Sequence, residues 1–256
     1  MIVDPRDAML ERLVSDAGIT SGMRVLDLGS GHGRVTAMLS RIVGDEGYVV
    51  GVDRDPNAIA VARSNAARLG LRNVRFEMSE LGALADASFE NPFDGRFDAA
   101  VGRRVLMYVR DPIAALRAAR AHVRSGGVFV VQEQDTSMVP VSSAPTPLHD
   151  KIHGWVWAMV QRENANPRFG LELPSLFEGA GLVLEDIRVE AVMQTAKRRL
   201  ATAEMVRAVM PRIVAQGVAT EDEIDIDTLD QRLERELVET GASFIGDVVY
   251  GAWGRC

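Results

Sequence analysis

The stretch VLDLGSGHG, from Val25 to Gly33, decides the fold of this chain. An apolar run that contains Asp27 ends in glycines at positions 29, 31 and 33, and residues 35–42 continue with apolar side chains at helical spacing. This pattern predicts a buried strand, a tight turn and the start of a helix. Glycine suits such a turn because it accepts positive φ and lets a ligand approach the backbone. The helix N-terminus then offers unpaired N–H groups to an anionic group.

The spacing of the glycines indicates which ligand the turn binds. A dinucleotide fingerprint, G-x-G-x-x-G, would need glycine at position 34, where this chain has Arg34. The spacing here is G-x-G-x-G, and it resembles motif I of the class I S-adenosylmethionine-dependent methyltransferases. In that family the loop binds the methionine end of the cofactor, and the acid at the position of Asp27 interacts with the cofactor's amino group.

Two further acidic residues stand where the same family binds the nucleoside. The apolar run 48–52 ends in Asp53, where the family has a carboxylate for the ribose hydroxyls, and such charge-assisted hydrogen bonds are strong. The run 74–76 is followed by SEL, and Glu80 stands where the family has an acid, most often Asp, that accepts the adenine amino group. Because glutamate is one methylene longer than aspartate, Glu77 is an alternative to Glu80.

The resemblance continues through a fourth and a fifth strand. FDAAVG, residues 97–102, leads into RRVLMYV and a helix over 111–122, and SGGVFVVQE follows over 125–133. The matching segments span about residues 20–135 and identify the chain as a member of the class I methyltransferases of small-molecule type. The resemblance implies S-adenosylmethionine as methyl donor and S-adenosylhomocysteine as product. It assigns cofactor binding to Asp27, Gly29, Ser30, Gly31, His32, Gly33, Asp53, Arg54, Glu80, Leu81, Gly102 and Arg103.

The alternation of strands and helices as far as Glu133 predicts an α/β fold, with a parallel sheet and crossover helices. The strand order does not follow from periodicity. The resemblance implies a Rossmann-like, doubly wound, seven-stranded sheet in the order 3-2-1-4-5-7-6, with strand 7 antiparallel and helical lid insertions. Strand six is expected near residues 182–192 and strand seven over 244–253.

A single domain is expected over residues 1–256, with residues 1–135 as its cofactor-binding half. Two insertions, 136–172 and 195–241, lie where the family builds its acceptor pocket. The first begins with a Pro-, Ser- and Thr-rich stretch, and long loops in compact domains are usually functional or disordered. We therefore expect the segment 134–170 to be a mobile lid over the acceptor. Residues that either line an apolar acceptor pocket or belong to the core are Met138, Trp155, Trp157, Met159, Met193, Met205 and Met210.

A general base is needed only where the methylated atom must first lose a proton. His149 and His153, four residues apart on one face of a predicted helix, are the first candidates because histidine titrates near neutral pH. A structural role is the alternative for each of them. Glu133, at the end of the fifth strand, and Tyr108 are the next candidates. No motif supplies a third ligand beside the two histidines, so no metal site is expected.

Several other classes of methyltransferase do not fit the sequence. The net charge of −7 disfavours sequence-independent binding to nucleic acid. DNA amino-methylating enzymes have Asn or Asp, two prolines and an aromatic residue after strand four, whereas this chain has GRRV over 102–105. Arg103 and Arg104 stand where catechol-type enzymes have metal-binding carboxylates. The single cysteine, Cys256, provides neither the nucleophile of cytosine C5 enzymes nor a cysteine-based zinc site. After these exclusions, the function that remains is a metal-independent, in-line transfer of a methyl group to a small molecule.

The bulk composition agrees with a soluble enzyme, and a cytoplasmic location is the default expectation. The hydrophobic content of 47% supports a sizeable core, and no apolar run approaches the roughly 20 residues that span a bilayer. The N-terminus lacks the basic start and apolar run of a signal peptide. No nucleic-acid or membrane partner is expected, and both monomer and homodimer remain open. Two other functions also remain open: an NAD-dependent oxidoreductase, which the glycine spacing disfavours, and a protein of this fold that binds the cofactor but catalyses another reaction, such as cyclisation.

Overall fold

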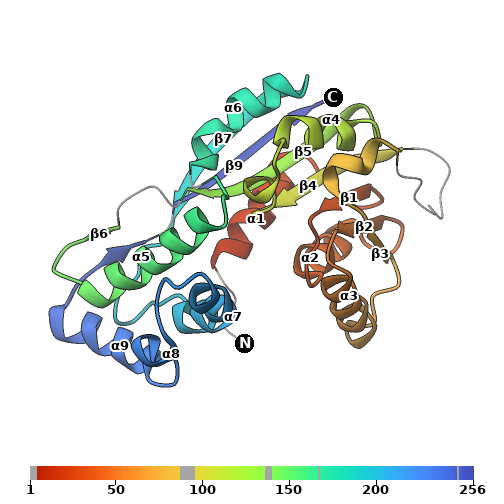
Figure 1. Cartoon of the computed structure of the whole chain (residues 1–256). Coiled ribbons are helices and arrows are strands. Elements are labelled where there is room, and N and C mark those ends of the chain that lie inside the picture. The colour runs from red at the N-terminus through yellow and green to blue at the C-terminus, as the bar shows by residue number, and fades with distance from the viewer. Residues whose placement is uncertain (1–4, 87–95, 136–139, 167, 247) are drawn as a thin grey trace. The chain divides into compact units, whose positions relative to one another are not determined.

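A computed structural model describes residues 5–86, 96–135, 140–166, 168–246 and 248–256 (Figure 1). The chain divides into two compact units. The sheet unit comprises residues 10–133, 170–188 and 250–256, and the insertion unit comprises residues 1–9, 134–169 and 189–249. The change from the sheet unit to the insertion unit at residue 134 lies next to the predicted end of the cofactor-binding half. That the whole chain acts as a single domain stays a prediction.

The sheet has seven strands in the order β3-β2-β1-β4-β5-β9-β7. Its strands are β1 (Arg24–Leu28), β2 (Tyr48–Asp53), β3 (Val74–Met78), β4 (Phe97–Arg103), β5 (Val123–Asp135), β7 (Val183–Ala191) and β9 (Val248–Arg255). The pairs β1–β2, β1–β4, β2–β3 and β4–β5 are parallel, and the final strand is antiparallel. The predicted fold class and strand order are therefore confirmed.

Two of the helices that accompany these strands, those at residues 56–69 and 112–120, begin at a recognisable sequence signal. The helices are α1 (Pro5–Asp16), α2 (Arg34–Val43), α3 (Pro56–Leu69), α4 (Pro112–Arg120) and α6 (Phe169–Gly179), with 3₁₀ turns η1 (Leu81–Asp86) and η2 (Leu106–Tyr108). Both α3 and α4 start at an Asp-Pro pair. The carboxylate of Asp55 accepts from the Asn57 N–H and that of Asp111 from the Ala114 N–H, each at 2.9 Å. These caps satisfy donors that the helix leaves free, and proline suits the first helical position.

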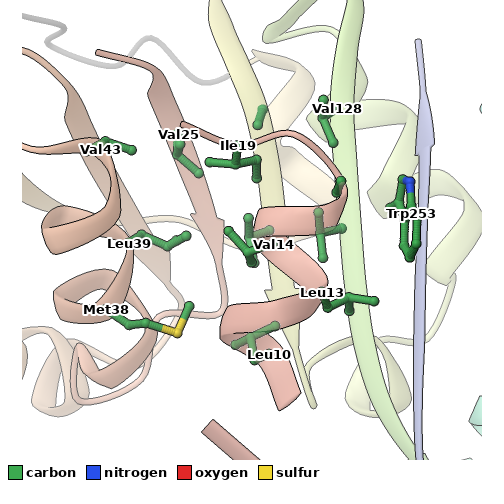
Figure 2. Close-up of a cluster of buried hydrophobic side chains, with 14 of the residues drawn as sticks. Leu10, Leu13, Val14, Ile19, Val25, Met38, Leu39, Val43, Val128 and Trp253 are labelled. Carbon is green, nitrogen blue, oxygen red and sulfur yellow. The ribbon is translucent and has the colours of Figure 1, made fainter. Parts of the chain in front are cut away.

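The main core of the sheet unit lies between α1, α2 and one face of the sheet. Leu10, Leu13 and Val14 from α1 pack with side chains of β1, β4 and β5 and with Trp253 of β9 (Figure 2). Burying a large apolar side chain stabilises the fold by roughly 1.5–3 kcal/mol. This packing fixes β1, and with it the start of the glycine turn.

The insertion unit is mainly helical. It contains α5 (Pro147–Arg162), α7 (Thr202–Ala215), α8 (Glu221–Ile224) and α9 (Leu229–Thr240), with a short antiparallel pair of β6 (Val141–Ser142) and β8 (Phe244–Ile245). Helix α5 contacts both α7 and α9. Leu229, Leu233 and Leu237 form the buried stripe of α9. No helix in the described part of the chain is long and apolar enough to cross a membrane.

Strand seven differs from its predicted course. Residues 244–253 were expected to form one strand, but the structure has β8 and β9 as separate strands. Phe244 exchanges two backbone hydrogen bonds with Gln194, at 2.8 and 2.9 Å, and β8 also pairs with β6. The start of the predicted strand therefore belongs to a separate two-stranded sheet.

Candidate cofactor site

The turn after β1 is held in a conformation that only glycine adopts readily. Gly29, Gly31 and Gly33 have φ values of 69°, 50° and 83°. A Cβ on Gly29 would lie 2.2 Å from Cγ2 of Val105, whereas a Cβ on Gly31 would have no atom within 4 Å. The first glycine is therefore required for packing within the protein. The second faces open space, where a ligand can approach the backbone.

Asp53, the last residue of β2, connects this turn with the next loop. Its Oδ2 accepts from the Gly31 N–H at 2.8 Å, and its Oδ1 accepts from the Asp55 N–H at 2.9 Å. An ionised carboxylate has about four lone-pair sites. Both oxygens of Asp53 can therefore accept further hydrogen bonds from hydroxyl groups of a ligand.

Asp27 lies beneath the turn. Its side chain is buried and accepts from the Thr36 hydroxyl at 2.5 Å, which links β1 to α2. Burial raises the pKa of this carboxyl group to about 7, while the hydrogen bond from Thr36 opposes the shift. Asp27 does not line the cavity described below. Its predicted contact with the cofactor's amino group stays a prediction.

A cavity of about 620 Å³ opens beside the turn, within the sheet unit. Its lining residues lie at or after the carboxyl ends of β1, β2, β3 and β4, where ligands bind in open α/β sheets. They are Gly29, Gly31, Asp53, Arg54, Ser79, Glu80, Leu81, Gly82, Arg104, Val105, Tyr108, Val109, Arg110, Asp111 and Ala114. The volume is within the usual range for a small-molecule or cofactor site.

The cavity brings together half of the predicted cofactor residues. Gly29, Gly31, Asp53, Arg54, Glu80 and Leu81 line it, together with the catalytic candidate Tyr108; Asp27, Ser30, His32, Gly33, Gly102 and Arg103 do not. Ser30 supports the turn instead, because its N–H donates to the Val52 carbonyl at 2.9 Å. The role of each predicted residue in cofactor binding stays a prediction.

Sequence reasoning missed the contribution of the segment after β4. Arg104, Val105, Arg110, Asp111 and Ala114 line the cavity, whereas the prediction named Arg103. Arg104 has a φ of 49°, which is uncommon for a residue other than glycine. Nothing in the sequence marks this turn, because an arginine gives no signal for positive φ.

The charges around the cavity are mixed. Arg54, Arg104 and Arg110 contribute positive charge, and Asp53, Glu80 and Asp111 contribute negative charge. The Asp111 carboxylate already caps α4. A zwitterionic ligand with a nucleoside fits such a lining, because carboxylates accept from hydroxyl and amino groups while arginine donates to a carboxylate.

Glu80 is better placed than Glu77 for the predicted adenine contact. Glu80 is exposed and lines the cavity, whereas Glu77 forms an ion pair with Arg75 on the same strand.

Glu80→Leu removes the acceptor, and we expect cofactor affinity to fall by about 3- to 10-fold, because a hydrogen bond contributes roughly 0.5–1.5 kcal/mol. Glu80→Gln keeps an acceptor and should bind more tightly than Glu80→Leu in isothermal calorimetry. Glu77→Gln serves as the control; equal affinities of wild type and both Glu80 variants would contradict the assignment.

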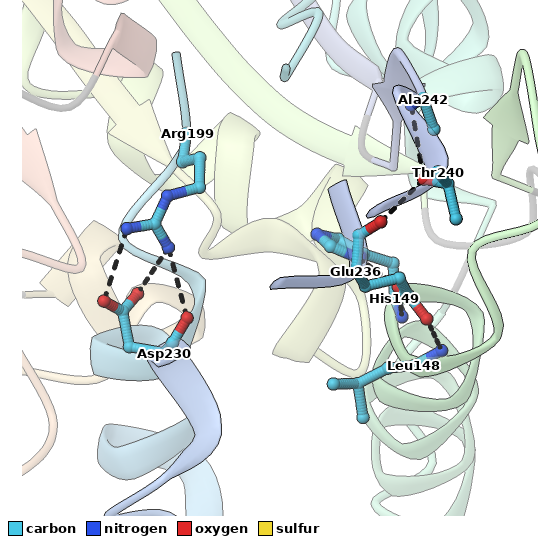
Figure 3. A network of polar contacts seen from close by, with 7 residues as sticks. All are labelled: Leu148, His149, Arg199, Asp230, Glu236, Thr240 and Ala242. Atoms are coloured by element: carbon cyan, nitrogen blue, oxygen red, sulfur yellow. Dashed lines mark hydrogen bonds and ion pairs between the residues drawn. The ribbon is translucent and has the colours of Figure 1, made fainter. Parts of the chain in front are cut away.

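The two candidate histidines lie on α5 in the insertion unit. His149 is buried; its Nδ1 lies 2.6 Å from Oε2 of Glu236 on α9, and its ring packs against Phe244 in a tilted arrangement, with a centroid distance of 4.7 Å and an interplanar angle of 51°. Glu236 also accepts from the backbone N–H groups of Leu148 and His149 (Figure 3). His153 is half-buried. Catalytic roles for both histidines stay predictions, and no sequence motif indicated Glu236.

Glu133 lies in the sheet unit and does not line the cavity. Its Oε1 accepts from the Val105 and Leu106 N–H groups at 3.0 and 2.9 Å. Burial raises the pKa of Glu133 to about 7, although the two backbone hydrogen bonds lower it. Within the described ranges, no group of three or more His, Cys, Asp or Glu side chains could hold a metal ion.

The apolar residues of the insertions differ in how deeply they are buried. Trp155 and Met159 are buried in the insertion unit, Trp157, Met205 and Met210 are half-buried, and Met193 is 52% exposed. Met138 lies outside the described residues, as does part of the predicted lid segment. The acceptor-pocket role of these residues stays a prediction.

A family model and several known proteins match this chain. A family model described as a methyltransferase domain matches residues 19–203, more than half of the chain. An arsenite methyltransferase from Aquipseudomonas alcaligenes is 36% identical over 113 residues, which cover 43% of this chain and 32% of that protein. The chain thus spans about a third of that relative's length. A demethylmenaquinone methyltransferase from Staphylococcus aureus is 28% identical over 190 residues, or 70% of this chain and 75% of that protein.

The fold is also that of solved structures. The YcgJ protein from Bacillus subtilis superposes with a TM-score of 0.59 at 19% sequence identity, covering 97% of this chain and 98% of that protein.

Proposed function

The chain belongs to the class I S-adenosylmethionine-dependent methyltransferases, and we propose that it transfers the methyl group of S-adenosylmethionine to a small-molecule acceptor. The observation that carries this proposal is the cavity at the carboxyl ends of β1 to β4. There the open face of Gly31 and the carboxylates of Asp53 and Glu80 line one space. The resemblance to the family assigns each of the three to one part of this cofactor.

In this proposal each loop binds a different part of the cofactor. The turn at Gly29 and Gly31 contacts the methionine end, Asp53 accepts from the ribose hydroxyls and Glu80 accepts from the adenine amino group. When bound, the cofactor supplies a sulfonium methyl group that is already activated for transfer. The protein then has to hold the acceptor in line with that methyl group and exclude water. A base is needed only for an acceptor that loses a proton.

The acceptor is best sought among organic molecules. Arsenite, the substrate named for one relative, is a soft species, and soft ions and metalloids prefer thiolate ligands. The sequence has a single cysteine, Cys256. We therefore propose an organic acceptor that is methylated without a metal ion, and quinone-like compounds are the first to test, because a demethylmenaquinone methyltransferase is among the relatives.

Asp53→Ala should weaken binding of S-adenosylmethionine by about 10- to 100-fold. A hydrogen bond to a charged group contributes roughly 1.5–3 kcal/mol, and each 1.4 kcal/mol is a factor of ten in affinity. Asp55→Ala is the matched control, since it removes a nearby carboxylate that caps α3 but does not line the cavity. Calorimetry measures both variants. An affinity of Asp53→Ala equal to that of Asp55→Ala would remove Asp53 from the cofactor site.

The reaction itself is tested by incubating the protein with S-adenosylmethionine labelled at the methyl group and a panel of organic acceptors. Transfer of label, with S-adenosylhomocysteine formed in equal amount, supports the proposal. Tight binding of the methyl donor without transfer to any acceptor would favour a non-methylating reaction in this cavity. Tighter binding of NAD than of S-adenosylmethionine would favour an oxidoreductase and contradict the proposal.

A further inference from the structure

Two consecutive residues of β5 hold the turn that follows β4. The Gln132 carbonyl accepts from the Arg104 N–H at 2.8 Å, and the Glu133 carboxylate accepts from the next two N–H groups, those of Val105 and Leu106. Glu133 has no exposed surface. A carboxylate buried in this way is costly unless it is hydrogen-bonded, and the two backbone donors, which both reach Oε1, offset part of its desolvation.

The turn held by Glu133 forms a wall of the cofactor cavity. Val105 lines the cavity, and its side chain lies so close to the Cα of Gly29 that no Cβ could be accommodated there. It also lies close to Gly102, where an added Cβ would be 3.3 Å from Cγ1 of Val105. The position of Val105 therefore determines the space beside the glycine turn.

We propose that Glu133 is a positioning residue for the cofactor cavity, which acts through the Val105 and Leu106 amides and not as a proton acceptor for the substrate. This inference rests on the proposed function for the identity of the ligand. Without the carboxylate, the half-buried N–H of Val105 and the buried N–H of Leu106 lose their acceptor, and a buried donor left unsatisfied is costly. The turn would then move to find other partners, and Val105 would leave its place against Gly29.

Two variants separate positioning from base catalysis. Glu133→Gln keeps a carbonyl oxygen for the two amides but removes the base, and Glu133→Leu removes both. We expect Glu133→Gln to bind S-adenosylmethionine within about threefold of wild type and to retain most turnover, because a neutral acceptor replaces much of the hydrogen bonding. Glu133→Leu should bind at least about tenfold more weakly, from the loss of about 1.4 kcal/mol or more. Gln132→Leu is the control for an apolar substitution of a buried side chain on the same strand.

Calorimetry with S-adenosylmethionine alone gives these affinities without any acceptor. A base would behave differently: its loss lowers turnover by about 10²- to 10⁴-fold in both variants and leaves the affinity for the methyl donor unchanged. That result would overturn the proposal, as would wild-type affinity in Glu133→Leu. If Glu133→Leu does not fold, Glu133→Gln still decides between the two roles through turnover.

Hydrogen exchange of the Val105 and Leu106 amides, measured by NMR, tests the inference independently of the ligand. Both amides should exchange slowly in wild type and in Glu133→Gln, and at least about tenfold faster in Glu133→Leu, which corresponds to about 1.4 kcal/mol of lost local stability. Unchanged exchange would overturn the positioning role. Failure of the wild type to bind S-adenosylmethionine, with exchange as expected, would contradict the proposed function and leave the positioning role supported.

Discussion

Gly29→Ala should reduce the affinity for S-adenosylmethionine by at least about 100-fold, an effect of about 3 kcal/mol. Two causes act at this position. The φ of 69° costs an alanine roughly 1–2 kcal/mol, and the new Cβ would lie 2.2 Å from Cγ2 and 2.8 Å from Cβ of Val105. Either the glycine turn or Val105 must move, and both line the cavity. Calorimetry measures the affinity, and circular dichroism establishes that the variant is folded.

A matched variant separates the clash from the backbone strain. Gly22 has a φ of 82°, and an added Cβ would have no atom within 4 Å. Gly22→Ala therefore carries the strain without the clash, and we expect it to bind the cofactor as wild type does. Adding Val105→Ala to Gly29→Ala removes the 2.2 Å contact with Cγ2 but leaves the 2.8 Å contact with Cβ, so we expect only part of the lost affinity, about tenfold, to be recovered. Binding by Gly29→Ala at the level of Gly22→Ala would show that Val105 does not define this wall.

The contrast between Gly29 and Val105 shows what could be predicted from the sequence. The glycine turn was evident from its local pattern, and the resemblance to the family placed Asp53 and Glu80 beside it; the structure has Gly29, Gly31, Asp53 and Glu80 around one cavity. Val105 belongs to the same wall, but its role depends on a close approach between the ends of β1 and β4, which no local pattern encodes. Arg104 was missed for a related reason, because its positive φ is imposed by the turn and not by its own side chain.

Contacts within the insertion unit could be predicted from the sequence even less. The leucine spacing of α9 indicates a helix, but its partner α5 lies far away in the sequence. His149 and Glu236 are 87 residues apart, and their contact depends on how two helices pack. Helix α7 contains Pro211, a residue that normally argues against a helix interior, and its span was predicted only as part of an insertion. The split between β8 and β9 likewise depends on the pairing of Phe244 with Gln194.

Glu236→Leu should lower the free energy of unfolding of the insertion unit by about 3–5 kcal/mol, the usual cost of removing one partner from a buried pair. Glu236 accepts from Nδ1 of His149 and from two backbone N–H groups at the start of α5, and the substitution leaves all three donors without this acceptor. Asp227→Asn is the control, because the ion pair of Asp227 with Arg207 is exposed, and such pairs contribute less than about 1 kcal/mol.

Tryptophan fluorescence can follow the unfolding of the insertion unit separately. The chain has three tryptophans, of which Trp155 and Trp157 lie on α5 and Trp253 lies on β9 in the sheet unit. In a Trp253→Phe background, urea unfolding followed by fluorescence reports on α5 alone. A midpoint for Glu236→Leu equal to that for Asp227→Asn would contradict a stabilising role of the pair.

Variants of His149 in the Trp253→Phe background test whether this residue also has a catalytic role. His149→Asn keeps an N–H donor for Glu236 but removes the imidazole, so it should lose less stability than His149→Ala. If His149 is the base, both variants lower turnover equally and leave the affinity for S-adenosylmethionine unchanged, because the base acts on the acceptor. The alternative result is that turnover falls in proportion to the loss of stability, so that His149→Asn has nearly the turnover of wild type. In that case the imidazole only joins α5 to α9. His153→Ala then tests the remaining histidine of α5, with retained turnover indicating a reaction governed by proximity and orientation without a histidine base.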